Sequence, residues 1–254
     1  MNHTVNHTLN HAQDHALKNM RNTSMPFFEQ LLLATEAQKM NFLSAPIIAD
    51  VLEGRFTKQT YLCFLNQAYH HVRHTTPLLM AAGSRLQPHQ EWVRKTMSHY
   101  IVEEIGHEQW ILDDIEALGY ERATFADGEP PVTSEVMVAY LYDYVQRQNP
   151  MGIFGMVLVL EGTSSGLAPT VGSLVQAKLA LPDTAMTYLT THGELDQEHM
   201  KFFEATMNKV TNPADQAAII HVADMTYQLY GDVYRAIPAL ALAAAGDDSV
   251  SAAA

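Results

Sequence analysis

Apolar residues recur every three to four positions through most of the chain, which is the spacing of one buried face of an α-helix. In the first such segment, five apolar residues keep this helical spacing: Phe27, Leu31, Ala34, Ala37 and Met40. Sustained alternation of apolar and polar residues is nearly lacking, and no Asn-Gly dipeptide marks a hairpin turn. The pattern therefore predicts an all-α fold.

Glycine, proline and capping residues divide this pattern into about seven helices. We expect these helices at residues 27–40, 57–85, 91–118, 134–148, 152–181, 183–210 and 213–242. Thr57 and Ser134 are candidate N-caps for two of them. Pro77 is expected to kink its helix, and Pro169 to mark a kink or a junction. The expected fold is a single-domain helical bundle.

Composition and charge limit the classes of function. Of the 254 residues, 47% are hydrophobic and 17% are charged, as in globular proteins and unlike disordered chains. The net charge of -13 argues against a nucleic-acid partner, because such a surface repels phosphates. The single Cys63, more typical of packing than of a nucleophile here, fits a reducing compartment such as the cytoplasm. No apolar run reaches the roughly 20 residues of a membrane span.

The two ends of the chain differ from the middle in residue composition. Residues 1–24 are rich in His and Asn and are expected to form a disordered leader, although their regularly spaced histidines could bind a metal adventitiously. Residues 25–242 are expected to form the helical domain, and residues 243–254 a flexible, Ala-rich tail.

Two helical segments carry metal-binding residue types on one face. Glu104 and His107 stand three positions apart, and His192, Asp196 and His199 stand at i, i+4 and i+7. On a helix each of these groups shares one face. Glu103, four positions before His107, competes with Glu104 as a ligand, and the histidines could instead be core residues bonded to backbone.

Glu161 ends the apolar run 153–160 and is therefore expected to be buried. A buried carboxylate needs a cation, a hydrogen-bond network or a proton, and a metal would satisfy it. Carboxylates and imidazoles without thiolates suit iron or manganese, and acidic-x-x-His pairs on separate helices are typical of dinuclear sites in bundles. The candidate metal ligands are Glu104, His107, Glu161, His192, Asp196 and His199.

The segment from Pro46 to Tyr69 resembles the opening of the TenA/PqqC superfamily, whose members have the haem-oxygenase-like fold. The six candidate ligands are similar to those of the haem-oxygenase-like di-iron oxidases within it, and closest in pattern to the UndA-type fatty-acid decarboxylases. The resemblance covers roughly residues 25–240. It implies a bundle of about seven helices around two iron ions, which activate O₂ to oxidise or fragment a small carboxylate-bearing substrate such as a fatty or amino acid.

At several positions this sequence differs from other members of the superfamily, and these differences argue against their activities. Leu160 stands where the member that builds p-aminobenzoate from its own side chain has a tyrosine. Cys63 lies too early to be the TenA nucleophile, and PqqC lacks metal and needs a more basic pocket. No histidine occurs between His15 and His70, where haem oxygenases have their haem ligand.

The resemblance also directs attention to the substrate. Three carboxylates leave two ferrous ions with a net positive charge, which suits a substrate carboxylate. The candidate substrate-binding residues are Tyr69, His70, Arg73 and Tyr227, with Arg73 a candidate anchor for the acidic head unless it lies at the surface. An external electron donor is compatible with this chemistry, and the family favours a homodimer.

Two other interpretations remain open. A ferritin-like di-iron bundle would need a fourth carboxylate from Glu29 or Glu36, and would leave His192 without a role. A metal-free TenA/PqqC-like protein would be a binding or regulatory module. Metal analysis distinguishes these interpretations from a di-iron oxidase.

Overall fold

The computed structural model describes the backbone of residues 25–251 and the side chains of residues 25–191 and 198–244. All regular structure in this range is helical, which confirms the predicted all-α class. The α-helices are α2 (Phe27–Leu43), α3 (Pro46–Leu52), α4 (Lys58–Val72), α5 (Thr75–Ser84), α6 (Glu91–Glu104), α7 (His107–Ala117), α8 (Arg122–Ala126), α9 (Val132–Arg147), α10 (Ile153–Leu179), α11 (Thr187–Met207) and α12 (Pro213–Ser251). Short 3₁₀ turns lie at Pro88–Gln90, Pro150–Gly152 and Asp183–Ala185.

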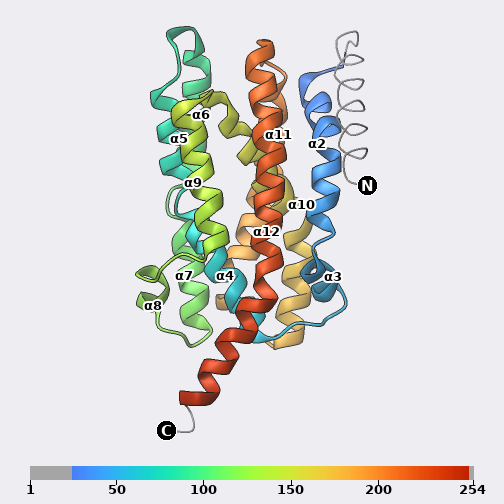
Figure 1. The fold of residues 1–254 in the computed structure, drawn as a ribbon, viewed down its shortest axis with the longest axis vertical. Helices are drawn as coiled ribbons and strands as arrows, with labels where there is room; N and C mark the ends of the chain where they lie inside the picture. Colours follow the sequence, from blue (N-terminus) through green and yellow to red (C-terminus); the bar gives the residue numbers. More distant parts are fainter. Residues whose placement is uncertain (1–24, 252–254) are drawn as a thin grey trace, which may run out of the picture.

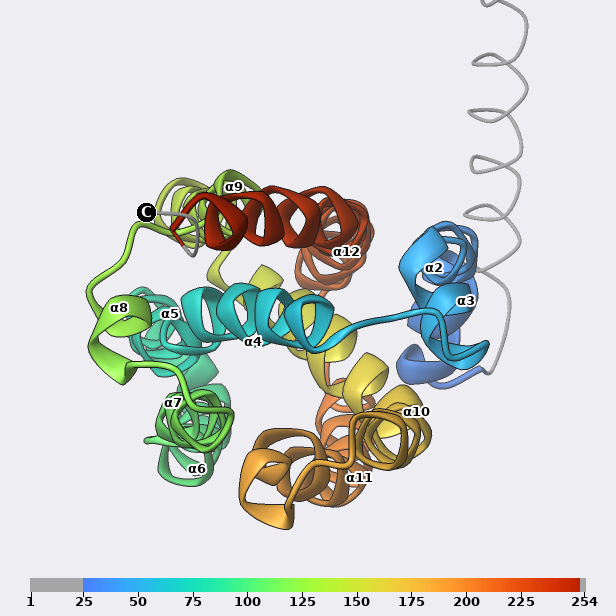
Figure 2. The same ribbon diagram turned by 90° about the horizontal axis from the view of Figure 1, so that it is seen from below.

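The longer helices run roughly side by side along the length of the molecule (Figure 1). Viewed from below, α10 lies beside α11, α9 lies beside α12, and α4 crosses between these two pairs (Figure 2). Helix α10 packs against both α11 and α12, and α4 packs against α7, α9 and α12. The core is therefore shared by helices from the beginning, middle and end of the chain.

The segment expected as one helix at 57–85 forms two helices. Thr57 caps α4 as predicted, because its hydroxyl accepts a hydrogen bond from the Thr60 amide at 3.2 Å. The helix ends at Val72, and Pro77 lies in the first turn of α5, where its missing N–H is not needed. The proline therefore accompanies a break in this segment instead of a kink.

The N-cap predicted at Ser134 is wrong. Helix α9 begins two residues earlier, directly after Pro131. The Ser134 side chain is fully buried, and its hydroxyl donates to the backbone oxygen of Gln67 at 3.3 Å and contacts the side-chain oxygen of the same residue. Ser134 thus joins α9 to α4 through a buried polar contact.

Proline does not interrupt the last long helices. Helix α10 continues through Pro169 as one element, and α12 continues through Pro238 to Ser251, beyond the end expected at residue 242. The apolar stretch Pro150–Leu179 is long enough to span a membrane, but 67% of its most apolar window is buried inside the fold. Its composition is accounted for by its place in the core.

Close packing of α10 on α12 depends on Gly155. A β-carbon at this position would lie 2.4 Å from the backbone nitrogen of Ala223 and 2.5 Å from the backbone oxygen of Ile219. We expect Gly155→Ala to lower the free energy of unfolding by about 3 kcal/mol, because backbone atoms must move apart. Gly166→Ala on the same helix is the control, since a β-carbon there would have no atom within 4 Å, and it should stabilise the helix by about 0.5–1 kcal/mol. Urea unfolding measures both changes, and equal effects would contradict the close approach of α10 and α12.

Candidate metal centre

A break between α6 and α7 positions the first pair of candidate ligands. The segment expected as one helix at 91–118 stops at Glu104 and restarts at His107. Between them Ile105 is extended, and Gly106 has a φ of 94°, a left-handed conformation that favours glycine. Glu104 and His107 are therefore neighbours across a break and not on one helical face. Both are buried, and His107 Nδ1 lies 3.2 Å from Glu104 Oε2.

Glu161 is buried, as its place after an apolar run predicts. The preceding residues of α10, from Ile153 to Val159, are all buried. The Glu161 side chain is only 8% exposed. The carboxylate is thus held inside the protein by a helix whose position the core determines.

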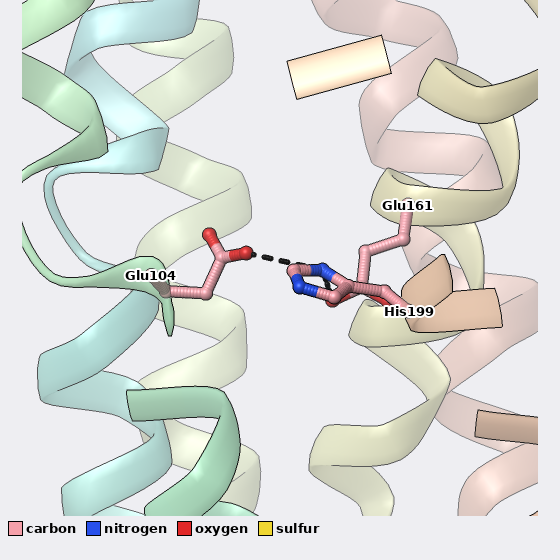
Figure 3. A group of neighbouring side chains, drawn as sticks. All are labelled: Glu104, Glu161 and His199. Atoms are coloured by element: carbon pink, nitrogen blue, oxygen red, sulfur yellow. Dashed lines mark ion pairs between the residues drawn. The ribbon is translucent and has the colours of Figure 1, made fainter. Parts of the chain in front are cut away.

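His199 brings these helices together. Its Nδ1 atom lies 3.4 Å from Glu104 Oε1 and 3.6 Å from Glu161 Oε1. Glu104 approaches from α6, and Glu161 and His199 approach from α10 and α11 on the other side (Figure 3). One ligand atom from each of these three residues lies within 4.8 Å of the other two. The geometry suits a metal ion between them.

The charge around this group also fits a metal. Two carboxylates, Glu104 and Glu161, are buried close to one another, while no lysine or arginine is buried among the described side chains. Buried negative charge requires compensation, and oxygen and imidazole ligands are those that iron and manganese accept. The observed residues therefore fit the iron that the resemblance implies.

Of the remaining predicted ligands, the structure describes the side chain of only one, His107. His107 lies beside Glu104 at the start of α7, and stacks on Trp110 with ring centroids 4.0 Å apart. His192 and Asp196 belong to α11, but their side chains lie outside the described residues. Their role as ligands stays a prediction.

Asp114 ties α11 to α7. It is fully buried, and its carboxylate accepts hydrogen bonds from the backbone amides of Thr187 and Tyr188 at 2.8 and 2.9 Å. Burial raises the pKa of Asp114 to about 6, although these two hydrogen bonds lower it. The carboxylate fixes the start of the helix that carries His199.

A pocket opens beside the candidate ligands. Among its lining residues are Glu104 and Glu161, together with His71, Tyr100 and Tyr188. The imidazole of His71 contacts the backbone oxygen of Gln67 through Nδ1 at 2.9 Å. His71 is one of several residues near the end of α4 that the sequence suggests could line a pocket, whereas nothing in the sequence singles out Tyr188, which stands four positions, or one helical turn, before His192.

A second, largely apolar pocket adjoins the first. Ser164, Tyr188 and Tyr230 line both pockets, so the two are neighbours. The cavity volume of the apolar pocket is about 90 Å³. On α10 its lining residues extend from Thr163 to Val175, about 18 Å along the helix at about 1.5 Å per residue.

None of the four candidate substrate-binding residues lines either pocket. Arg73 is exposed, stacks over the Tyr69 ring at 5.3 Å and reaches the backbone oxygen of Ala126. His70 is buried, and burial together with Arg73 and His74 lowers its pKa to about 4. Tyr227 packs against Phe42, and neither Tyr227, His70, Tyr69 nor Arg73 lines either pocket.

Comparison with known proteins identifies the family. The family model described as iron-containing redox enzyme matches residues 62–231. The chain belongs to this haem-oxygenase-like family. No curated protein sequence matches this chain.

Several solved structures have the same fold as this chain. A domain of unknown function with a haem-oxygenase-like fold from Shewanella denitrificans is 22% identical, with a TM-score of 0.75, covering 85% of this chain and 93% of that one. A TenA homologue from Pseudomonas syringae is 12% identical, with a TM-score of 0.68 and the same coverage. Haem oxygenase-1 from Synechocystis, solved with haem, is 11% identical, with a TM-score of 0.68, covering 91% of this chain and 100% of that one. At these identities the similarity shows the fold alone.

Proposed function

We propose that this protein is a non-haem di-iron oxidase that uses O₂ to oxidise a carboxylate-bearing substrate with an apolar tail, such as a fatty acid. The observation that carries the proposal is the meeting of Glu104, Glu161 and His199 from three helices beside an apolar pocket. With His107 and the predicted ligands His192 and Asp196, they would hold two iron ions. Bound iron would supply the electrons that reduce O₂.

The chain's own residues give this chemistry its place and its surroundings. The buried carboxylates of Glu104 and Glu161 offer oxygen ligands where little water reaches them. Tyr188 and Tyr230, which line both pockets, stand between the candidate centre and the space for a tail. A substrate with its tail in the apolar pocket would have its polar head directed to the ligands, which orients it for reaction.

Two observations argue against the alternative centres, a haem site and a ferritin-like di-iron site. No histidine occurs in the sequence of α2, so this helix offers no imidazole to a haem. Glu29 and Glu36, which a ferritin-like centre would need, are both exposed on that helix and do not join the buried group. The ferritin-like interpretation is therefore not supported.

The apolar pocket favours fatty acids over amino acids. Its walls are mostly aliphatic and aromatic, among them Phe56, Phe64, Leu167 and Val171. Burial of a methylene group in such a pocket contributes about 0.8 kcal/mol, whereas an ammonium group buried there would be unpaired. An unbranched acyl chain suits the pocket's extent along α10.

Iron content and O₂ consumption test the proposal. Anaerobic reconstitution with Fe(II) should give about two iron ions per chain, as measured by iron analysis after gel filtration. Fatty acids, and not amino acids of similar size, should then accelerate O₂ consumption, and mass spectrometry should detect the oxidised product. Protein that retains no iron, or that consumes O₂ equally fast with and without every acid tested, would exclude this function.

A further inference from the structure

His199 presents its two ring nitrogens to different partners. Nδ1 faces the buried carboxylates of Glu104 and Glu161 at 3.4 and 3.6 Å. Nε2 lies 3.0 Å from Oε2 of Glu103, the residue directly before Glu104. The two consecutive glutamates at the end of α6 therefore contact the same imidazole at different atoms.

The end of α6 explains how adjacent glutamates reach one ring. Successive side chains on a helix point about 100° apart, and the helix stops at Glu104, so no further turn covers this end. The Glu104 side chain is 4% exposed, whereas that of Glu103 is 38% exposed and reaches His199 from the rim. The same Oε2 atom of Glu103 also lies 3.4 Å from Nε2 of His99, one turn earlier on α6.

A carboxylate on Nε2 determines which nitrogen can bind a metal. An ionised carboxylate only accepts hydrogen bonds, so it requires the proton of a neutral imidazole to be on the nitrogen that it faces. With a metal bound to the Glu104 and Glu161 carboxylates, Glu103 would keep the imidazole proton of His199 on Nε2, which leaves the lone pair on Nδ1, the nitrogen that faces those two residues. Such a hydrogen bond also fixes the ring's orientation and raises its basicity as a ligand.

We propose that Glu103 is the positioning residue of the metal centre, which holds His199 in the tautomer and orientation that direct Nδ1 to the metal. This inference rests on the proposed metal centre and deepens it. It also separates the roles of the two adjacent glutamates, because Glu104 lies on the metal side of the imidazole and Glu103 on the opposite nitrogen. From the residues alone, Glu103 could be weighed only as a competing ligand.

Manganese binding tests this role without requiring catalysis. Mn(II) is titrated into the metal-free wild-type protein and into the variants Glu103→Ala, Glu103→Gln and Glu116→Ala, and electron paramagnetic resonance measures free and bound Mn(II). Glu103→Ala should weaken the site that contains His199 by about 10–100-fold, the usual cost of losing such a partner. Glu103→Gln should remain within about threefold of wild type, because its amide oxygen can still accept the Nε2 proton. Glu116, an exposed glutamate on α7, serves as the matched control.

The number of bound ions distinguishes a positioning residue from a ligand. At saturating Mn(II), Glu103→Ala should bind as many ions as wild type, with an altered spectrum because the ring is free to rotate. Loss of an ion in both Glu103 variants would show a ligand, and wild-type affinity in Glu103→Ala would show no role. Circular dichroism checks folding, and Glu103→Gln supplies the test by its ion count and spectrum if the alanine variant does not fold. Normal Mn(II) binding without any substrate oxidation would contradict the proposed function and leave this inference intact, whereas a wild-type protein that binds no metal would overturn both.

Discussion

Glu161→Gln should deprive the protein of at least one iron ion and of nearly all O₂-dependent activity. The substitution keeps the size of the side chain but removes the charge of a buried carboxylate that lies 3.6 Å from His199 Nδ1. Loss of an outer partner of a metal ligand costs 10–100-fold in affinity, so loss of the ligand itself should cost more than about 100-fold. Iron analysis and an anaerobic Fe(II) titration measure the change.

The metal-free form should respond to Glu161→Gln in the opposite direction. Without iron, Glu104 and Glu161 place two carboxylates close together in the interior, and removing one charge relieves this cost. We expect metal-free Glu161→Gln to unfold at higher urea concentration than metal-free wild type. Glu204→Gln, an exposed change on α11, should alter neither iron content nor stability. A Glu161→Gln protein with full iron content would show that Glu161 is not a ligand.

Ala168→Phe should shorten the acyl chain that the enzyme prefers. Ala168 is buried in the wall of the apolar pocket, between the ends of its α10 lining at Thr163 and Val175. A phenyl ring there would exclude the far part of a long tail. Three excluded methylenes at about 0.8 kcal/mol each lower kcat/KM for the longest substrate by about 60-fold, while a short acid should be oxidised normally.

Kinetics with a series of chain lengths measures this shift. Ala177→Phe is the matched control, because Ala177 is exposed on the same helix and does not line the pocket. Equal losses for short and long acids in Ala168→Phe would indicate damage to the centre and not a shortened pocket. An unchanged chain-length profile, with the variant folded, would place the tail elsewhere.

Part of the candidate centre could be predicted from the sequence, whereas its geometry could not. Glu161 could be predicted because a carboxylate after a long apolar run on one helix must be buried. The spacing of Glu104 and His107 predicts that they share one helical face, but the left-handed Gly106 separates them into two helices. A single glycine inside a helical pattern is tolerated in many proteins, so the sequence alone does not reveal that this one permits a break.

Helical periodicity did not predict which residues near the end of α4 face the pocket. His71 lines the pocket beside the ligands, whereas Arg73 is exposed. Two positions along a helix correspond to about 200°, so His71, in the last turn of α4, and Arg73, the residue directly after its end, point to nearly opposite sides. The charge of Arg73 favoured it as an anchor, and nothing in the residues near it indicates which side of α4 faces the interior.

The buried pair of carboxylates has a consequence for the lifetime of the protein in a cell. Glu104 and Glu161 lie in the interior without a buried lysine or arginine among the described side chains, so an ion bound between them stabilises the folded state by mass action. If iron binds here as proposed, more chains would populate the unfolded state when iron is scarce and would become substrates for proteases. The abundance of the enzyme would then follow the iron supply, and no separate sensor would be needed.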